Sequence, residues 1–349
     1  HLPHAGLWIG AQVTDALGGF TGVTTAMLDA PVGGAASAYT EFTPSVTGLM
    51  RRSSLYSSSL WHPDAISELD AIALFDDATA KNTSGNPEAH RPLNVAVRQI
   101  SHQWSHPDKQ DLAIQRFVIR NAGSFPLTNV HVGLWAELAS GPKNSYLSWP
   151  PSISGSIYGS WWNRKLLAWD GPQRLLREHR CTAPPIPGSC QFEITPAWMG
   201  LELLTQPTTG QNVTVAVWNY SPLDASRDED TERYANLSSG VLADVTAPAY
   251  LPGTGDPVEL LALGPFPMIA PGDSIEVAFA LVGGAEEADI LQHATTAQRL
   301  HDAGYNAFSV GVGGAPPSGS LLLAPIANPL PGGACSLVIE LPGGEPASL

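Results

Sequence analysis

Glycine and proline recur so often along this chain that its regular elements must be short. The sequence contains 34 Gly and 31 Pro among 349 residues, and only 14% of its residues are charged. Glycine favours turns and proline interrupts helices, because one adopts positive φ angles and the other lacks a backbone N–H. Apolar residues still make up 43% of the chain, enough to bury a sizeable core. Short apolar runs between frequent turns are typical of an all-β protein.

Alternating apolar runs locate the expected strands. They span residues 93–100, 112–123, 130–138, 212–220 and 274–284. Successive side chains of a strand point to opposite faces, so a period of two predicts strands with one buried face. The second and third runs lie on either side of a short turn and are predicted to pair as an antiparallel meander. Together the runs predict an antiparallel β-sandwich.

One segment near the C-terminus departs from this period. Residues 284–305 carry four apolar residues at helical spacing: Ile290, Ala294, Ala297 and Leu300. Acidic residues begin the segment and Gly304 follows its last turn, as the helix dipole and C-terminal capping favour. The pattern predicts a single helix of about four or five turns. Residues 67–75 fit either a second, short helix or a strand.

The patterns divide the chain into a large and a small part. Residues 1–308 predict a large β-sandwich domain, with two smaller sandwiches as the alternative. Residues 309–319 are rich in Gly and Pro and predict a linker. Residues 320–349 begin further strands, but a segment this short cannot bury a sandwich of its own. We expect it either to dock on the large domain or to begin an incomplete one.

Net charge restricts the partners of the chain. It has 17 Lys and Arg against 32 Asp and Glu, a formal net charge of −15. Nucleic acid and anionic lipid both require a cationic surface, so neither is an expected partner. No run of about 18 apolar residues occurs, which argues against membrane insertion. The first ten residues lack the features of an export signal, so we expect a mature product or a fragment.

Three cysteines bear on the compartment. Cys181 and Cys190 bracket a Pro-rich loop, and a disulfide between them would fit an oxidising environment. A metal pair is the alternative, but no second Cys or Cys–His pair accompanies them. Cys335 is left over, and it fits either a buried thiol or an intermolecular bridge.

The stretch "SHQWSHPDKQD" (101–111) raises the question of a metal site. On a strand, His102 and His106 share a face but stand about 13 Å apart, because a strand rises about 3.3 Å per residue. A helix would bring the two imidazoles together as zinc ligands, but Pro107 and the neighbouring strand runs argue against a helix. We expect a structural row of His102, Trp104 and His106.

An acidic stretch at residues 224–234 raises the question of a calcium site. Residues 224–234 could bind calcium through Asp228 and Asp230, but they lack the ligand spacing and central glycine of the helix-loop motif, so a solvated loop is favoured. Calcium is the one cofactor that the sequence leaves open.

Catalytic motifs are scarce. Asp64, Glu68 and Asp70 offer a carboxylate pair for glycoside hydrolysis, although helix capping by Asp64 is a simpler role. No nucleophile elbow, phosphate-binding loop or His-Glu-x-x-His motif occurs. The sequence therefore favours a non-enzymatic protein without deciding the question.

An aromatic stretch at 156–171 is the best candidate for binding. The side chains that could stack on sugar rings are Tyr158, Trp161, Trp162 and Trp169. The alternative is that these residues belong to the core of the sandwich.

Several blocks resemble, in order, a group of large exported bacterial proteins of unknown function. The blocks include "HAGLWIGA", "HPDAISELDAIALFDD", "HRPLNVAVRQISHQWS" and "GPFPMIAPGDSIEVAFALVGG". The last 23 residues resemble the opening strands of a flagellar-hook-cap-type immunoglobulin-like domain, similar to a type IX secretion sorting module. The resemblance implies an extracellular or cell-surface protein and brings no catalytic residues. It also implies that His1 is internal, which argues against a copper site formed by His1 and His4.

These observations predict a secreted, non-enzymatic structural or adhesive cell-surface protein, such as a self-assembling fibre or surface-layer subunit. The alternative is a secreted protein that binds or degrades carbohydrate. Its expected partners are other copies of the chain or a surface polysaccharide. A metal-dependent enzyme that uses His102 and His106 is the third hypothesis.

Overall fold

The chain forms two units, His1–Ala307 and Phe308–Leu349. The smaller unit contains a three-stranded antiparallel sheet of β15 (Leu322–Pro325), β16 (Leu337–Glu340) and β17 (Pro346–Ala347). Its interpretation as the start of an immunoglobulin-like domain stays a prediction. The computed structural model describes residues 4–26, 41–79, 90–138, 140, 164–181, 193–221, 229–252, 254–305, 322–325, 337–340 and 346–347.

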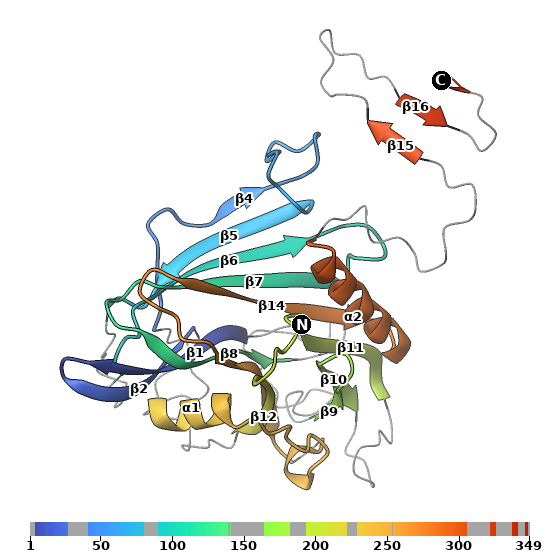
Figure 1. The fold of residues 1–349 in the computed structure, drawn as a ribbon. Helices are drawn as coiled ribbons and strands as arrows, with labels where there is room; N and C mark the ends of the chain where they lie inside the picture. The colour runs from blue at the N-terminus through green and yellow to red at the C-terminus, as the bar shows by residue number, and fades with distance from the viewer. Residues whose placement is uncertain are drawn as a thin grey trace. The chain divides into compact units, whose positions relative to one another are not determined.

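The larger unit is built from two antiparallel sheets (Figure 1). Sheet A has the order β12 (Asn212–Ser221), β13 (Asp256–Phe266), β8 (Leu127–Glu137), β1 (His4–Asp15) and β2 (Gly18–Thr25). Sheet B has the order β3 (Thr43–Pro44), β5 (Leu69–Asp76), β6 (Val95–Gln103), β7 (Leu112–Asn121), β14 (Ser274–Gly284), β11 (Glu193–Leu203), β10 (Leu175–Cys181) and β9 (Lys165–Asp170). A ninth strand, β4 (Met50–Arg52), also pairs with β5. The sheets confirm the antiparallel β-sandwich, and residues 67–75 belong to a strand.

Alternate residues of both sheets fill the space between them. Leu7 and Ile9 of β1 and Leu261 of β13 form one core cluster with Phe117 of β7 and Phe279 of β14. The two phenylalanine rings meet edge to face, with their centroids 6.3 Å apart. Each such side chain contributes about 1.5–3 kcal/mol when it leaves water, so this layer is the main source of stability.

Two helices cover the outer faces of the sheets. α1 (Asp230–Ser238) lies on sheet A, and α2 (Glu287–Asp302) lies on β14 and β11 of sheet B (Figure 1). A single 3₁₀ turn, η5 (Pro248–Tyr250), follows α1. In α2 the buried residues are those predicted from helical spacing: Ile290, Ala294, Ala297 and Leu300. Within the described residues, neither helix is long and apolar enough to cross a membrane.

The outer face of sheet A forms a second apolar layer. Trp8, Trp135 and Trp218 point away from sheet B and pack with Leu237 of α1. A β-carbon added at Gly133 would lie 2.8 Å from the Cδ2 atom of Leu237. The helix α1 therefore packs closely on β8 because a glycine stands at this position. The centre of sheet A is therefore buried on both faces.

Two sequence predictions were wrong at the level of local structure. The strands β7 and β8 do not form a meander, because β7 pairs with β6 and β14 in sheet B while β8 pairs with β1 and β13 in sheet A. The Asn121 side-chain amide donates to the carbonyls of Phe125 and Ile269, both at 2.9 Å, and so holds the chain as it crosses between sheets. The second error concerns residues 230–234, which begin α1 and are not a loop.

Candidate functional site

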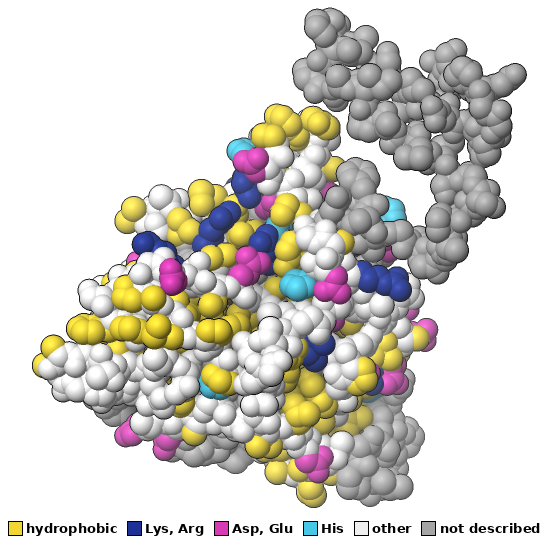
Figure 2. Space-filling view, viewed as in Figure 1, with side chains coloured by type: hydrophobic (Ala, Val, Ile, Leu, Met, Phe, Trp, Pro, Cys, Tyr) yellow, Lys and Arg dark blue, Asp and Glu magenta, His cyan; other side chains and the backbone are white. Residues whose placement is uncertain are grey.

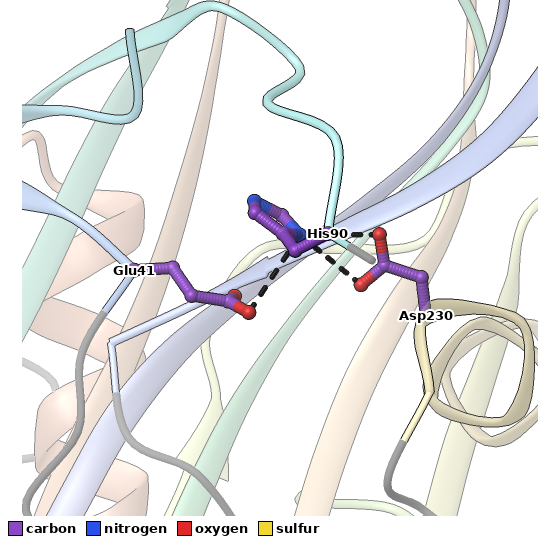
Figure 3. A group of neighbouring side chains, drawn as sticks. All are labelled: Glu41, His90 and Asp230. Atoms are coloured by element: carbon purple, nitrogen blue, oxygen red, sulfur yellow. Dashed lines mark hydrogen bonds and ion pairs between the residues drawn. The ribbon is translucent and has the colours of Figure 1, made fainter. Parts of the chain in front are cut away.

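A buried cluster of ionisable groups lies between α1 and the end of β2 (Figure 3). His90 Nδ1 is 3.1 Å from Asp230 Oδ2 and 3.6 Å from Glu41 Oε1. The three side chains offer ligand atoms within 4.8 Å of one another, a set that could hold a metal ion. Of the two calcium candidates from the sequence, Asp230 belongs to this cluster, and Asp228 lies outside the described residues.

The cluster already contains a fixed cation. The Arg233 guanidinium is fully buried, and its NH1 atom lies 3.7 Å from Glu41 Oε1 and 3.8 Å from Asp230 Oδ1. The other oxygen of Glu41 accepts hydrogen bonds from the backbone N–H and hydroxyl of Thr25, at 2.6 and 3.0 Å. Burial raises the pKa of Glu41, while the positive charges of His90 and Arg233 act in the opposite direction. A metal ion would be repelled by Arg233, so we interpret the cluster as an ion network that fastens α1 to sheet A.

A second pair joins residues that the sequence presented separately. Asp70 of β5 and His102 of β6 are cross-strand neighbours, with His102 Nδ1 2.8 Å from Asp70 Oδ1. The Ser67 hydroxyl donates to the same oxygen at 2.6 Å. Burial raises the pKa of Asp70, but the hydrogen bonds from His102 and Ser67 outweigh it and lower the pKa to about 2. Both side chains are buried, as expected for a structural pair.

The remaining sequence candidates of this region face other partners. His106 is exposed and pairs with Asp108 in the turn after β6. The carboxylate of Glu68 accepts hydrogen bonds from the backbone N–H and hydroxyl of Ser105. Asp64 lies in an exposed ion pair with His62, at 3.8 Å. The structure thus brings neither the two histidines nor the three carboxylates to a common reaction centre.

A cleft of about 730 Å³ opens along β9, at one edge of sheet B. Its chemically distinctive lining residues are Trp169, His179, Trp198, Asp244, Glu286 and Glu287. The rings of His179 and Trp198 stack with centroids 4.5 Å apart. Arg177 lies over the Trp198 ring at 4.7 Å and pairs with Glu287 at 2.6 Å. The cleft combines an aromatic wall with carboxylates, and it suits a ligand with an apolar face and a positive charge or several hydroxyls.

Of the four carbohydrate-binding candidates, the structure places Trp169 in this cleft. Tyr158, Trp161 and Trp162 lie outside the described residues. Cys181 is the last residue of β10 and is buried. Cys190 and Cys335 lie outside the described residues, so the disulfide between Cys181 and Cys190 stays a prediction.

Exposed apolar side chains gather at the opposite edge of sheet B. They are Val46, Leu49, Met50, Leu55, Tyr56 and Trp61. The side chains of Tyr56 and Trp61 are 73% and 43% exposed, and their rings stack with centroids 5.2 Å apart. Residues 45–63, which we call the cationic edge surface, include Arg51 and Arg52 but contain no Lys, Asp or Glu. Figure 2 shows hydrophobic side chains at the projecting tip of the larger unit, with His, Asp or Glu, and Lys or Arg atoms close by.

Sequence reasoning missed this surface because its apolar residues are scattered among serines without a period. The charges did not single it out either, because residues 138–169, 203–223 and 303–339 are longer stretches that also lack Asp and Glu. Sequence reasoning also missed Glu178 and Glu259, which share the inward-facing alternation of Leu176 and Leu261 and are fully buried. Burial raises the pKa of both glutamates.

Comparison with known proteins adds no family to this description. No protein-family model matches the chain, and no curated protein matches it. The resemblance to exported bacterial proteins stays an expectation, so function has to be inferred from the geometry of the described residues.

Proposed function

We propose that the chain is a secreted, non-enzymatic structural or adhesive subunit that associates with other copies of itself. The observation that carries the proposal is the cationic edge surface. Large contiguous apolar patches are rare on monomeric proteins and often mark sites of interaction. Tyr, Trp, Met and Arg are the residues enriched at the centres of protein interfaces, and Lys, Glu and Asp are depleted there. The surface follows this composition, and the sequence resemblance supports export.

Charge complementarity favours a second copy as the partner. Of the two arginines in the cationic edge surface, Arg52 pairs with the buried Asp70 at 3.7 Å, and Arg51 is exposed to a partner. Because the chain has a net charge of −15, every other copy offers acidic surface to Arg51, which speeds encounter and sets orientation. Two cationic edge surfaces facing each other would oppose Arg51 to its own counterpart, and like charges destabilise such contacts. The association is therefore expected to join different surfaces of the two copies.

The test compares two aromatic truncations of equal exposure. Trp61→Ala removes an aromatic ring from the cationic edge surface, and Phe125→Ala removes one that is also 43% exposed but lies in the β7–β8 turn. Sedimentation equilibrium of the full chain should show self-association that weakens about 30-fold in Trp61→Ala, as expected for an interface hot spot of about 2 kcal/mol. Phe125→Ala should behave as the wild type. A wild type that stays monomeric at high concentration and low salt would rule out the proposal.

A second function, carbohydrate binding, is favoured by one observation, the place of Trp169 in the cleft. An indole face stacks on the apolar face of a sugar ring, and carboxylates accept hydrogen bonds from its hydroxyls. Calorimetric titration with oligosaccharides chosen from a glycan array should then detect binding that Trp169→Ala abolishes and Trp61→Ala leaves intact. A blank array would exclude this function.

A further inference from the structure

We propose that the cationic edge surface of one copy docks into the cleft along β9 of the next copy, so that copies join head to tail. The inference rests on the proposed function, because it identifies the partner surface for the same association. It assigns the cleft to a segment of another copy of this chain.

The chemistry of the two surfaces is complementary. The cationic edge surface presents the exposed side chain of Arg51 and, five to ten residues further along the chain, the stacked rings of Tyr56 and Trp61. The cleft presents the rings of Trp169 and Trp198, and its described lining residues include three carboxylates and neither Lys nor Arg. Aromatic rings prefer offset or edge-to-face contacts with one another, and a guanidinium binds both carboxylates and aromatic faces.

Two carboxylates of the cleft are available to an incoming arginine. Glu287 is engaged by Arg177 at 2.6 Å. Asp244 and Glu286 are exposed, and neither forms an ion pair within the described part of the chain. Asp244 Oδ1 accepts hydrogen bonds from the backbone N–H and hydroxyl of Thr246, at 3.0 and 2.7 Å, and neither bond involves its Oδ2 atom. The cleft volume of about 730 Å³ lies in the range that accommodates a group of several side chains. An arginine and a neighbouring aromatic ring can therefore enter together.

The sheet order determines how this contact propagates. Seven strand-to-strand steps separate β4 from β9 in sheet B, which amounts to about 34 Å at about 4.8 Å per step. The two surfaces of one copy therefore cannot meet each other, and the contact has to form between copies. A contact between two different surfaces leaves one of each unoccupied at the ends, so it extends into a filament unless the copies close into a ring.

The experiment uses one variant for each surface in the full chain. The edge variant, Arg51→Glu with Trp61→Ala, retains an intact cleft. The cleft variant, Asp244→Lys with Glu286→Lys, retains an intact cationic edge surface, and it leaves the Arg177–Glu287 pair in place. Circular dichroism and thermal unfolding first establish that both variants fold as the wild type does; a cleft variant that fails this check is replaced by Asp244→Asn with Glu286→Gln.

Sedimentation velocity then measures the oligomeric state of each variant and of their mixture. Each variant alone should be monomeric, and an equimolar mixture should form a one-to-one heterodimer, because a single functional pair of surfaces remains between them. Reversal of both charges in one chain, Arg51→Glu with Glu286→Lys, should restore at least part of the self-association that either reversal alone removes.

The outcomes separate this inference from the proposed function. If the cleft variant associates as the wild type does while the edge variant is monomeric, the cationic edge surface binds elsewhere, and the head-to-tail inference is overturned while the proposed function stands. If the edge variant associates normally, the proposed function fails as well. A mixture that contains only monomers also overturns the inference.

Discussion

Gly133 of β8 lies directly beneath Leu237 of α1, and an alanine at this position should destabilise the protein. The added β-carbon would lie 2.8 Å from Leu237 Cδ2, 2.9 Å from Leu260 Cδ1 and 3.0 Å from the Cβ of Ala262. All three distances are shorter than an ordinary carbon–carbon contact of about 3.5–4.0 Å. Overpacking of this kind costs about 1–3 kcal/mol, and three simultaneous contacts place Gly133→Ala near the upper end.

The comparison that tests this packing combines Gly133→Ala with Leu237→Ala, which removes the closest neighbour of the added β-carbon. Leu237 is fully buried, so Leu237→Ala alone should cost about 2–5 kcal/mol through lost burial and the cavity left behind. In the double variant the closest contact is gone, and the new methyl group fills part of the cavity. The double variant should therefore be more stable than the sum of the single effects by about 1–2 kcal/mol, a typical coupling for residues in contact. The contacts with Leu260 and Ala262 keep the compensation partial.

Equilibrium unfolding in urea, followed by tryptophan fluorescence, measures the four free energies. Trp8 and Trp135 lie in the same apolar layer and report on it directly. Leu176→Ala is the matched control, because Leu176 is equally buried but lies between the two sheets. It should combine additively with Gly133→Ala. Additivity within about 0.5 kcal/mol for the Leu237 pair as well would refute the packing of α1 on β8 described above.

Three further predictions concern buried charges. Burial raises the pKa of Glu259 well above 4.5, so above pH 4.5 the folded protein keeps a proton that the unfolded chain releases. The free energy of unfolding therefore falls as pH rises above 4.5. Glu259→Gln should make this fall smaller in urea unfolding measured across pH. The pKa of Asp70 is lowered to about 2, so its contribution to the free energy of unfolding is present above pH 3.8 and is lost as pH falls toward 2. Asp70→Asn should weaken the pH dependence of acid unfolding between these two pH values. Arg233→Ala leaves the carboxylates of Glu41 and Asp230 buried without their guanidinium and should cost about 3–5 kcal/mol in urea unfolding; a loss below about 1 kcal/mol would contradict the ion network.

The comparison of the two helices shows what the sequence could predict. The buried apolar residues of α2 recur at helical spacing from Ile290 to Leu300, and its ends carry the charges that the helix dipole favours. α1 has nine residues, and Tyr234 and Leu237 are its large apolar contacts with sheet A. A pattern this short and polar resembles an exposed loop. Some of the tertiary contacts that stabilise α1 come from residues more than one hundred positions away in the sequence, such as Gly10 and Gly133.

The functional candidates show the same limit. His102 and Asp70 were both singled out from the sequence, but strand register alone makes them neighbours, and a single sequence does not reveal the register of strands thirty residues apart. Trp169 could be recognised as a binding candidate because aromatic residues cluster around it. The carboxylates that join it in the cleft come from Asp244, after α1, and from the start of α2, so the acidic character of the cleft was not predictable.

The double attachment of α1 has a kinetic consequence. A helix of nine residues is unstable in isolation, because nucleation is costly and few hydrogen bonds follow it. Here its first turn is held by Asp230 and Arg233 in the ion network, and its last turn is held by Leu237 in the tryptophan layer. Detaching either end exposes buried charge or buried indole to water, so fraying from one end is suppressed. The amides of α1 should therefore exchange their hydrogens with solvent as slowly as those of sheet A, in the same cooperative opening.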